Sequence, residues 1–366
     1  MHDVLSQGVD WHAFLRIVRR QRVEGLVHVA LQHAAVDTPL DVASELAATS
    51  AVITRDNLLH AAASLRLQSS FAAAGIPILF VKGITLSILA YGTLNLKKAR
   101  DIDVIVPVEA LPTAFDLLRQ AGYRLSSTTD PVGGEAEVLA QLSKETVWQD
   151  DAGILLELHS GLVDNPMMLP GIGLNSPTQL VPIASGKTLP TLQKEELFSY
   201  LCVHGAAHAW SRLKWLADVA ALLSREDEVE IERLYRRSIE LGAGRSAAQG
   251  LLLCSRLLGT QLPKPLVREL EADFATRWLV RIAMRSMAGA HGTRELDETV
   301  LGTVPIHFSH FLLMPGGKYK LSELKRKAGG RPTAASHSLP PILRLLHPLV
   351  AIPLWLRTRA RERIRH

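Results

Sequence analysis

Asp101-Ile102-Asp103-Val104-Ile105-Val106 is the stretch that decides the fold of this 366-residue chain. Side chains alternate between the two faces of a strand, so the two aspartates lie on one face and three apolar side chains lie on the other. Two neighbouring carboxylates on a half-buried strand repel each other unless one takes up a proton or a cation lies between them. Mg²⁺ or Mn²⁺ is the expected cation, because hard divalent ions prefer carboxylate oxygens and keep substrate phosphates as further ligands. The alternative is a strand edge with two solvated acids, since Asp-x-Asp alone is a weak motif.

The segment upstream of the aspartates favours a phosphate site. Residues 77–81 form a short apolar run that leads through Lys82-Gly83 into a helical pattern at residues 84–91. This order predicts a strand, a tight turn and a helix. Free N–H groups at the helix start, a glycine that permits close approach and a lysine all suit a phosphate group. The alternative is an ordinary glycine turn with a surface lysine.

A second carboxylate-bearing strand is predicted downstream. Asp150-Asp151-Ala152-Gly153 is a turn signal between predicted strands at residues 144–150 and 153–159, so we expect an antiparallel hairpin. Glu157 and His159 share one face of the second strand. Glu157 is therefore a candidate third acid, although a lone glutamate in a strand is more often simply solvated.

These motifs, in this order, resemble the nucleotidyltransferase superfamily of the DNA polymerase beta type. The motifs are Lys82-Gly83, then residues 100–103 after an intervening helix, then Glu157-Leu158-His159. The chain is most similar to a bacterial nucleotidyltransferase family in which Lys-Gly replaces the usual Gly-Ser, and losing that serine puts the exact triphosphate contacts in question. The resemblance extends over about residues 50–350: Arg55-Asp56-Asn57, which we expect to lead a helix, His204-Gly205, Leu213 to Asp218, Leu339-Pro340-Pro341 and His347-Pro348.

The resemblance implies an α+β fold, a polymerase-beta-like palm with a mixed sheet, flanked by N-terminal and C-terminal helical regions. In such families two aspartates and a third acid hold two metal ions that bind a nucleoside triphosphate. Carried onto this chain, Asp101, Asp103 and Glu157 are the expected catalytic residues and ligands of Mg²⁺ or Mn²⁺. The expected triphosphate contacts are Lys82, Gly83, Arg100 and Lys214.

The implied activity is the transfer of a nucleoside monophosphate from a nucleoside triphosphate to a small molecule, a peptide, a protein or RNA, with release of pyrophosphate. RNA is the less favoured acceptor, and the sequence leaves the acceptor, the base and the oligomeric state open. Two alternatives remain: a catalytically silent nucleotide-binding or scaffold protein, and a toxin-like transferase acting on tRNA or protein. The chain has no Ser-His-Asp elbow, no GxxxxGK[ST] loop and no GxGxxG turn.

Two pairs of residues on predicted helices can be interpreted either as functional or as purely structural. His204 and His208 stand four apart, as metal-binding histidines do, but the glutamate of a metalloprotease motif is missing, so packing or substrate contact is preferred. Lys214 and Asp218 are also four apart, and such a pair is usually a surface ion pair. The resemblance makes Lys214 a candidate for triphosphate contact instead.

The charge of the chain is unevenly distributed. Residues 318–366 carry twelve lysine and arginine residues against Glu323 and Glu362, a balance of +10, whereas the whole chain has +5 and residues 1–317 therefore have −5. Apolar residues 339–356 precede the last arginines, which suits contact with an anionic membrane surface, although packing against the body is the preferred alternative. The prolines there argue against a transmembrane span.

We expect the protein in the cytoplasm, with peripheral contact at the inner membrane surface as an option. Cys202 and Cys254 lie in apolar helical patterns, so they imply no disulfide framework. The N-terminus lacks the apolar core of a secretory signal. The predicted organisation is an N-terminal helical region (1–74) that covers the sheet, the palm (75–165), an irregular linker (166–192), a helical domain (193–300) and a basic, apolar extension (301–366).

Overall fold

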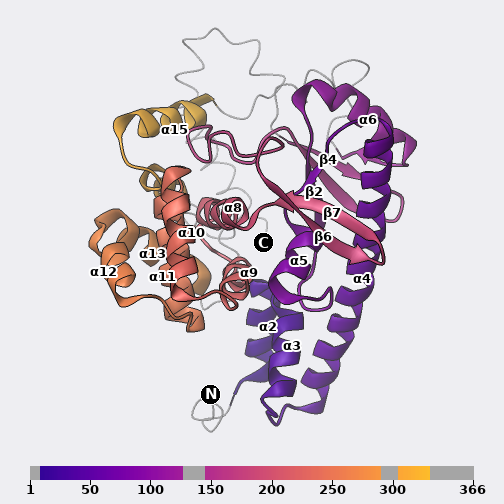
Figure 1. Ribbon diagram of the computed structural model, residues 1–366. Helices are drawn as coiled ribbons and strands as arrows, with labels where there is room; N and C mark the ends of the chain where they lie inside the picture. Colours follow the sequence, from indigo (N-terminus) through magenta and orange to yellow (C-terminus); the bar gives the residue numbers. More distant parts are fainter. Residues whose placement is uncertain (1–8, 127–144, 290–303, 330–366) are drawn as a thin grey trace, which may run out of the picture.

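The protein consists of a sheet-containing lobe and a helical lobe that meet along one side (Figure 1). The structure is a computed structural model, and it describes residues 9–126, 145–289 and 304–329. The α+β architecture with a mixed sheet, expected from the nucleotidyltransferase resemblance, is confirmed. No helix in the described ranges is both long enough and apolar enough to cross a bilayer.

A five-stranded sheet forms the centre of the first lobe, with the strand order β1-β2-β5-β4-β3. The strands β2 and β5 pair in parallel, and the other neighbours pair in antiparallel fashion. The predicted hairpin is confirmed, because β4 and β5 are antiparallel and joined by a turn in which the Gly153 amide donates to the Asp150 carbonyl oxygen. The strand bounds are β1 Leu79–Phe80, β2 Asp101–Ile105, β3 Arg124–Leu125, β4 Glu145–Gln149 and β5 Leu155–His159.

One face of this sheet is apolar and carries the core of the lobe. Ile102 and Val104 of β2 and Leu156 of β5 are buried against Phe71 and Phe115, which come from two helices on that face. Burying each large apolar side chain contributes roughly 1.5–3 kcal/mol. The opposite face is thereby left to the acids of β2 and β5. The helices of the lobe are α4 Leu40–Ala73, α5 Gly83–Tyr91, η1 Val108–Ala110 and α6 Leu111–Gln120.

The long helix α4 covers the apolar face, but the two helices before it do not. The helix α2 (Trp11–Gln21) instead hydrogen-bonds the helical lobe, where the Arg20 guanidinium and the Gln21 amide donate to the Met287 carbonyl oxygen. The helix α3 (Glu24–His33) packs against α4. The expectation that residues 1–74 form one layer over the sheet therefore holds for α4 alone.

The expectation that Arg55-Asp56-Asn57 leads a helix is wrong, because these residues lie in the middle of α4. Asn57 is fully buried there. Its amide donates to the Lys97 carbonyl oxygen at 2.6 Å, and its side-chain oxygen accepts from the Ala99 amide at 2.9 Å. Asn57 therefore fixes the loop that leads into β2.

The expectation that residues 166–192 are irregular is wrong in their second half. Strands β6 (Thr178–Ala184) and β7 (Lys187–Leu192) form a separate antiparallel hairpin, with Gly186 at a φ of +67° in its turn. Leu189 and Leu192 are fully buried, and β7 packs against β1 and α4. This packing offsets the weak strand propensity of a segment rich in Pro, Gly and Ser.

In the helical lobe, α8 lies on the side that faces the sheet lobe and packs against α9, α10 and α11 (Figure 1). Its ten buried residues include Phe198 and Cys202. Cys202 and Cys254 are both buried free thiols, as predicted. The helices of this part of the chain are α8 Lys194–Ala207, α9 Leu213–Leu223, α10 Glu228–Glu240, α11 Gly244–Leu258, α12 Lys264–Ala272, α13 Phe274–Ala288, α14 Val304–Ser309, η3 His310–Leu312 and α15 Gly317–Gly329.

Several predictions fall on segments outside the described residues. They concern the polar loop that follows β3, the Leu-Pro and His-Pro elements near residues 339–348, and most of the basic extension. Of that extension the structure describes only residues 304–329.

Candidate active site

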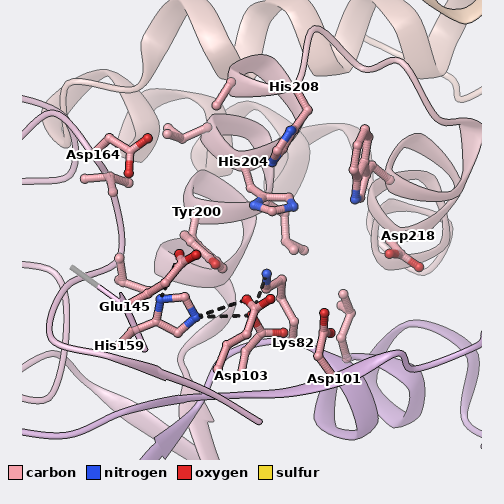
Figure 2. A pocket seen from close by; sticks show the side chains of 18 of the residues that line it. Lys82, Asp101, Asp103, Glu145, His159, Asp164, Tyr200, His204, His208 and Asp218 are labelled. Atoms are coloured by element: carbon pink, nitrogen blue, oxygen red, sulfur yellow. Dashed lines mark ion pairs between the residues drawn. The ribbon is translucent and has the colours of Figure 1, made fainter. Parts of the chain in front are cut away.

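A cleft of about 400 Å³ lies between the polar face of the sheet and the ends of α8 and α9. Figure 2 shows acids from β2 on one side of this cleft and histidines from α8 on the other. All the site residues expected from the sequence line it: Lys82, Gly83, Arg100, Asp101, Asp103, Glu157 and Lys214.

The parallel pairing of β2 and β5 brings the acids together. In the observed register Asp103 lies directly opposite Glu157, and Asp101 lies two residues earlier on the same face of β2. The Asp103 side chain is almost completely buried, whereas Glu157 remains 27% exposed towards the cleft. The third acid therefore lies on the strand adjacent to the aspartate pair.

His159 joins this cluster, although the sequence did not single it out as a ligand. One ligand atom each from Asp103, Glu157 and His159 lie within 4.8 Å of one another, a spacing suited to a metal ion. Asp101 is not a member of this tightest group and lies beside it (Figure 2). The shared face of Glu157 and His159 on β5 was the signal in the sequence that pointed to the histidine.

The donor atoms of this cluster fit a divalent cation. Both carboxylate oxygens of Asp103 and the Nε2 atom of His159 are buried, and within the described ranges none of them has a hydrogen bond of standard geometry. Buried polar atoms normally complete a hydrogen bond, so atoms that have at most ion-pair contacts require an explanation. Two carboxylates and an imidazole are donors that divalent metal ions accept.

Lys82 offsets part of the negative charge of the cluster. Its Nζ lies 2.7 Å from Asp103 Oδ1, and the His159 Nε2 lies 3.4 Å from the same oxygen. Burial alone would raise the pKa of the Asp103 carboxyl, but Lys82 and His159 hold it well below its ordinary value. Burial and the nearby charges of Asp103 and Glu157 raise the pKa of Asp101 to about 6. The two aspartates thus differ strongly in proton affinity.

The turn at Lys82-Gly83 requires a glycine at the start of α5. Gly83 has a φ of +60°, a left-handed conformation that favours glycine, and a Cβ there would lie 3.3 Å from the Asp101 carbonyl oxygen. Although burial opposes it, the anionic groups around Lys82, Asp103 among them, hold the pKa of its ammonium above the ordinary value. A permanent cation therefore lies beside a helix N-terminus, as anion binding requires.

An aromatic wall faces the acids across the cleft. The ring of His208 stacks on Trp215 with centroids 4.9 Å apart, and His204 lies edge-on to Trp215 at 5.7 Å. Burial lowers the pKa of both histidines, that of His208 to about 4, so both imidazoles are neutral at pH 7. The preferred interpretation of this pair as packing or substrate contact agrees with these positions, since neither residue belongs to a metal-ligand group in the described ranges.

The backbone at the end of α8 orients this wall. Gly205 has no space for a side chain, because an added Cβ would lie 2.5 Å from the Trp210 ring. Ala209 and Trp210 are both left-handed, with φ of +46° and +49°. The chain therefore turns sharply after His208 and folds Trp210 back under the helix.

The alternative interpretation of Lys214 and Asp218 as an ion pair is wrong. Asp218 is buried and instead contacts the Lys97 Nζ at 2.9 Å and accepts from the Tyr91 hydroxyl at 3.0 Å. Lys214 lies over the Trp215 ring at 5.6 Å. Burial, followed by repulsion from Lys97 and Arg22, lowers the pKa of Lys214 to about 8. Lys214 is therefore a cation in the cleft that Asp218 does not neutralise by direct contact.

The last wall of the cleft comes from residues 304–329. The His310 ring lies 2.8 Å, Nε2 to oxygen, from the Ala207 carbonyl at the end of α8, and the Tyr319 hydroxyl donates to the His310 carbonyl oxygen. Glu323 is buried and pairs with Arg326 at 2.5 Å. Tyr200, Glu145 and Asp164 also line the cleft. Sequence reasoning missed all of these residues, since no local motif marks them.

No curated protein sequence matches the chain. The model of a family described as uncharacterised nucleotidyltransferase matches residues 7–259, which include both faces of the cleft apart from the wall formed by residues 304–329. With more than half of its length matched, the chain belongs to this family of uncharacterised nucleotidyltransferases.

Proposed function

We propose that the protein transfers a nucleoside monophosphate from a nucleoside triphosphate to an acceptor hydroxyl and releases pyrophosphate. The observation that carries this proposal is the parallel register that places Glu157 opposite Asp103, in a cleft that also contains Lys82 and Gly83. Membership of a nucleotidyltransferase family supports nucleotidyl transfer as the general reaction.

Asp101, Asp103 and Glu157 are the proposed ligands of Mg²⁺ or Mn²⁺. Two observations support this assignment. The buried oxygens of Asp103 complete no hydrogen bond of standard geometry in the described ranges, and Glu157 is open to the cleft. Divalent ions in such a site stabilise the charge that develops on the attacking and leaving oxygens of an in-line displacement. The raised pKa of Asp101, which reflects burial and two nearby acids, is the cost of assembling these carboxylates.

The triphosphate contacts are proposed for Lys82, the Gly83 amide, Arg100 and Lys214. The acceptor oxygen forms a bond to the α-phosphorus, the bond from that phosphorus to its bridging oxygen breaks, and pyrophosphate leaves. The hydroxyl proton passes to a carboxylate of the site or to water. Fixed cations and helix N–H groups stabilise the departing charge without having to reorganise. Lys82 and the start of α5 supply both kinds of group.

The structure gives no support to the alternative of a catalytically silent protein. A nucleotide-binding or scaffold protein does not need a third acid, yet Glu157 lies beside the aspartate pair. No observation in the described ranges favours a toxin-like activity on tRNA or protein. Peripheral contact with an anionic membrane, which depends on the basic extension, remains a prediction.

Pyrophosphate release and thermal melting test the proposal. The protein is incubated with each of the four nucleoside triphosphates and Mg²⁺ or Mn²⁺, with and without candidate acceptors, and intact mass reveals self-modification. We expect one triphosphate with the ion to raise the melting temperature, and Asp103→Asn to abolish both this shift and turnover.

Asp116→Asn is the matched control, because Asp116 is exposed on α6 and its ion-pair partner in the described ranges is Arg119, one helical turn away. It should leave both readouts as in the natural protein. Undiminished turnover in Asp103→Asn, or the absence of any melting shift with all four triphosphates, would refute the proposal.

A further inference from the structure

His159 lies in the group formed with Asp103 and Glu157, but the proposed nucleotidyl transfer assigns it no role. Its ring is only 9% exposed, and its Nε2 lies 3.4 Å from Asp103 Oδ1 and 3.5 Å from Glu157 Oε2. Within the described ranges this buried nitrogen has no hydrogen bond of standard geometry. A buried nitrogen that points between two acids without completing a hydrogen bond is arranged as a ligand would be.

The other ring nitrogen faces a different carboxylate. Glu145 lies directly opposite His159 in the antiparallel pairing of β4 and β5, and its Oε2 is 3.8 Å from Nδ1. A carboxylate on the outer side of a metal-bound imidazole is the usual arrangement, because it favours the proton on that nitrogen and turns the other lone pair towards the ion. Glu145 lies on the side of the ring where such a carboxylate belongs, and Nε2 is turned towards the acids.

We propose that His159 Nε2 is a metal ligand together with Asp103 and Glu157, and that this mixed donor set selects a divalent transition metal ion, such as Mn²⁺, over Mg²⁺. Imidazole binds first-row transition ions well, whereas Mg²⁺ prefers an all-oxygen octahedron and gives up its water reluctantly. The inference deepens the proposed nucleotidyl transfer and rests on it for the role of the ion, but its test requires no turnover.

Electron paramagnetic resonance of the full-length, metal-stripped protein tests the inference with Mn²⁺ as the probe. Titration gives the Mn²⁺ affinity, competition gives the Mg²⁺ affinity, and pulsed spectra of protein with isotopically labelled histidine report a nitrogen bound to the ion. We expect a histidine nitrogen coupling in the natural protein. His159→Gln should lose this coupling and weaken Mn²⁺ binding by at least about tenfold, with a smaller effect on Mg²⁺.

His204→Gln is the matched control, because His204 lines the same cleft but does not belong to the metal-ligand group. It should keep the nitrogen coupling. A Mn²⁺ centre without histidine coupling in the natural protein, or an equal loss of both ions in His159→Gln, would assign His159 to ion pairing with the acids only and overturn the inference.

These outcomes separate the inference from the function on which it rests. A bound ion without nitrogen coupling overturns the role of His159 but leaves nucleotidyl transfer standing. A protein that binds neither Mn²⁺ nor Mg²⁺ loses both. If His159→Gln does not fold, the spectrum of the natural protein still decides.

Discussion

The ammonium group of Lys82 contacts the carboxylate of Asp103, which is also a proposed metal ligand. Lys82 and a metal ion would therefore neutralise the same carboxylate. Removing one partner of a buried ion pair typically costs roughly 3–5 kcal/mol, because the remaining charge stays buried. We therefore expect Lys82→Gln to lower the free energy of unfolding of the metal-free protein by about 3 kcal/mol. An added divalent ion should then raise the melting temperature more than in the natural protein, as calorimetry with and without the ion can measure.

The control for Lys82→Gln is Lys98→Gln, since the Lys98 side chain is half exposed and its Nζ is 3.9 Å from Asp56. Such exposed pairs contribute little to stability. An identical metal-induced shift in Lys82→Gln and in the natural protein would show that Lys82 does not balance the charge of Asp103.

Lys214 makes stability depend on pH. Burial, Lys97 and Arg22 lower its pKa from 10.5 to about 8, so the unfolded chain binds the proton more tightly than the folded protein does. Buried charge therefore destabilises the folded protein below about pH 8, and this penalty disappears as the pH rises towards 10.5. We expect Lys214→Met to raise the free energy of unfolding at pH 7 by roughly 1–3 kcal/mol, after allowance for solvent screening.

Urea unfolding at a series of pH values checks this prediction. The natural protein should gain stability between about pH 8 and 10.5, and Lys214→Met should lack that gain. Lys264→Met, at the exposed start of α12, should behave like the natural protein. A Lys214→Met variant that keeps the full pH dependence would count against this account.

At the scale of single elements, the end of α8 depends on a glycine. A methyl group at Gly205 would lie 2.5 Å from the Trp210 ring, which is fully buried and cannot move aside freely. Overpacking of this kind typically costs roughly 1–3 kcal/mol. We expect Gly205→Ala to lower the free energy of unfolding by about 2 kcal/mol in thermal or urea denaturation.

Gly173→Ala provides the comparison for Gly205→Ala, because nothing lies within 4 Å of the position that its Cβ would take. Its stability should change little. If Gly205→Ala were equally harmless, Trp210 would not be held against α8 in the way the structure indicates.

At the scale of the whole molecule, Asp218 joins the two lobes. It lies on α9 of the helical lobe, and its partners Lys97 and Tyr91 belong to the sheet lobe. We expect Asp218→Ala to cost roughly 3–5 kcal/mol, because Lys97 is left buried without its counter-charge. Tyr91→Phe removes one hydrogen bond to a charged group and should cost only about 1.5–3 kcal/mol. Urea unfolding measures both, and equal effects would argue against a charge-based link between the lobes.

The sequence predicted features that depend on local patterns. The alternation of polar and apolar residues along 101–106 identified β2, and the turn residues at 150–153 identified the β4–β5 hairpin. Both signals come from residues that are neighbours in the sequence. The register that places Glu157 beside Asp103 came from family resemblance, since a parallel pairing between distant strands has no local signal.

The sequence-based predictions that were wrong or incomplete share one physical cause, which is tertiary packing. The β6–β7 hairpin has the composition of a linker and is held in place by contacts with β1 and α4. Lys214 and Asp218 have the spacing of a helical ion pair, yet Asp218 is paired with Lys97 from another element. The ring nitrogen of His159 reaches the acids only through its side-chain conformation, which the sequence does not encode locally.

The wall formed by residues 304–329 lies outside the segment that the family model matches. The acids and Lys82 lie inside that segment, so the residues proposed for transfer and this wall of the cleft are carried by different stretches of chain. Substitutions among His310, Tyr319 and Arg326 would reshape one wall of the cleft without changing the acids of β2 and β5. Residues 304–329 can therefore change while the proposed metal ligands are kept.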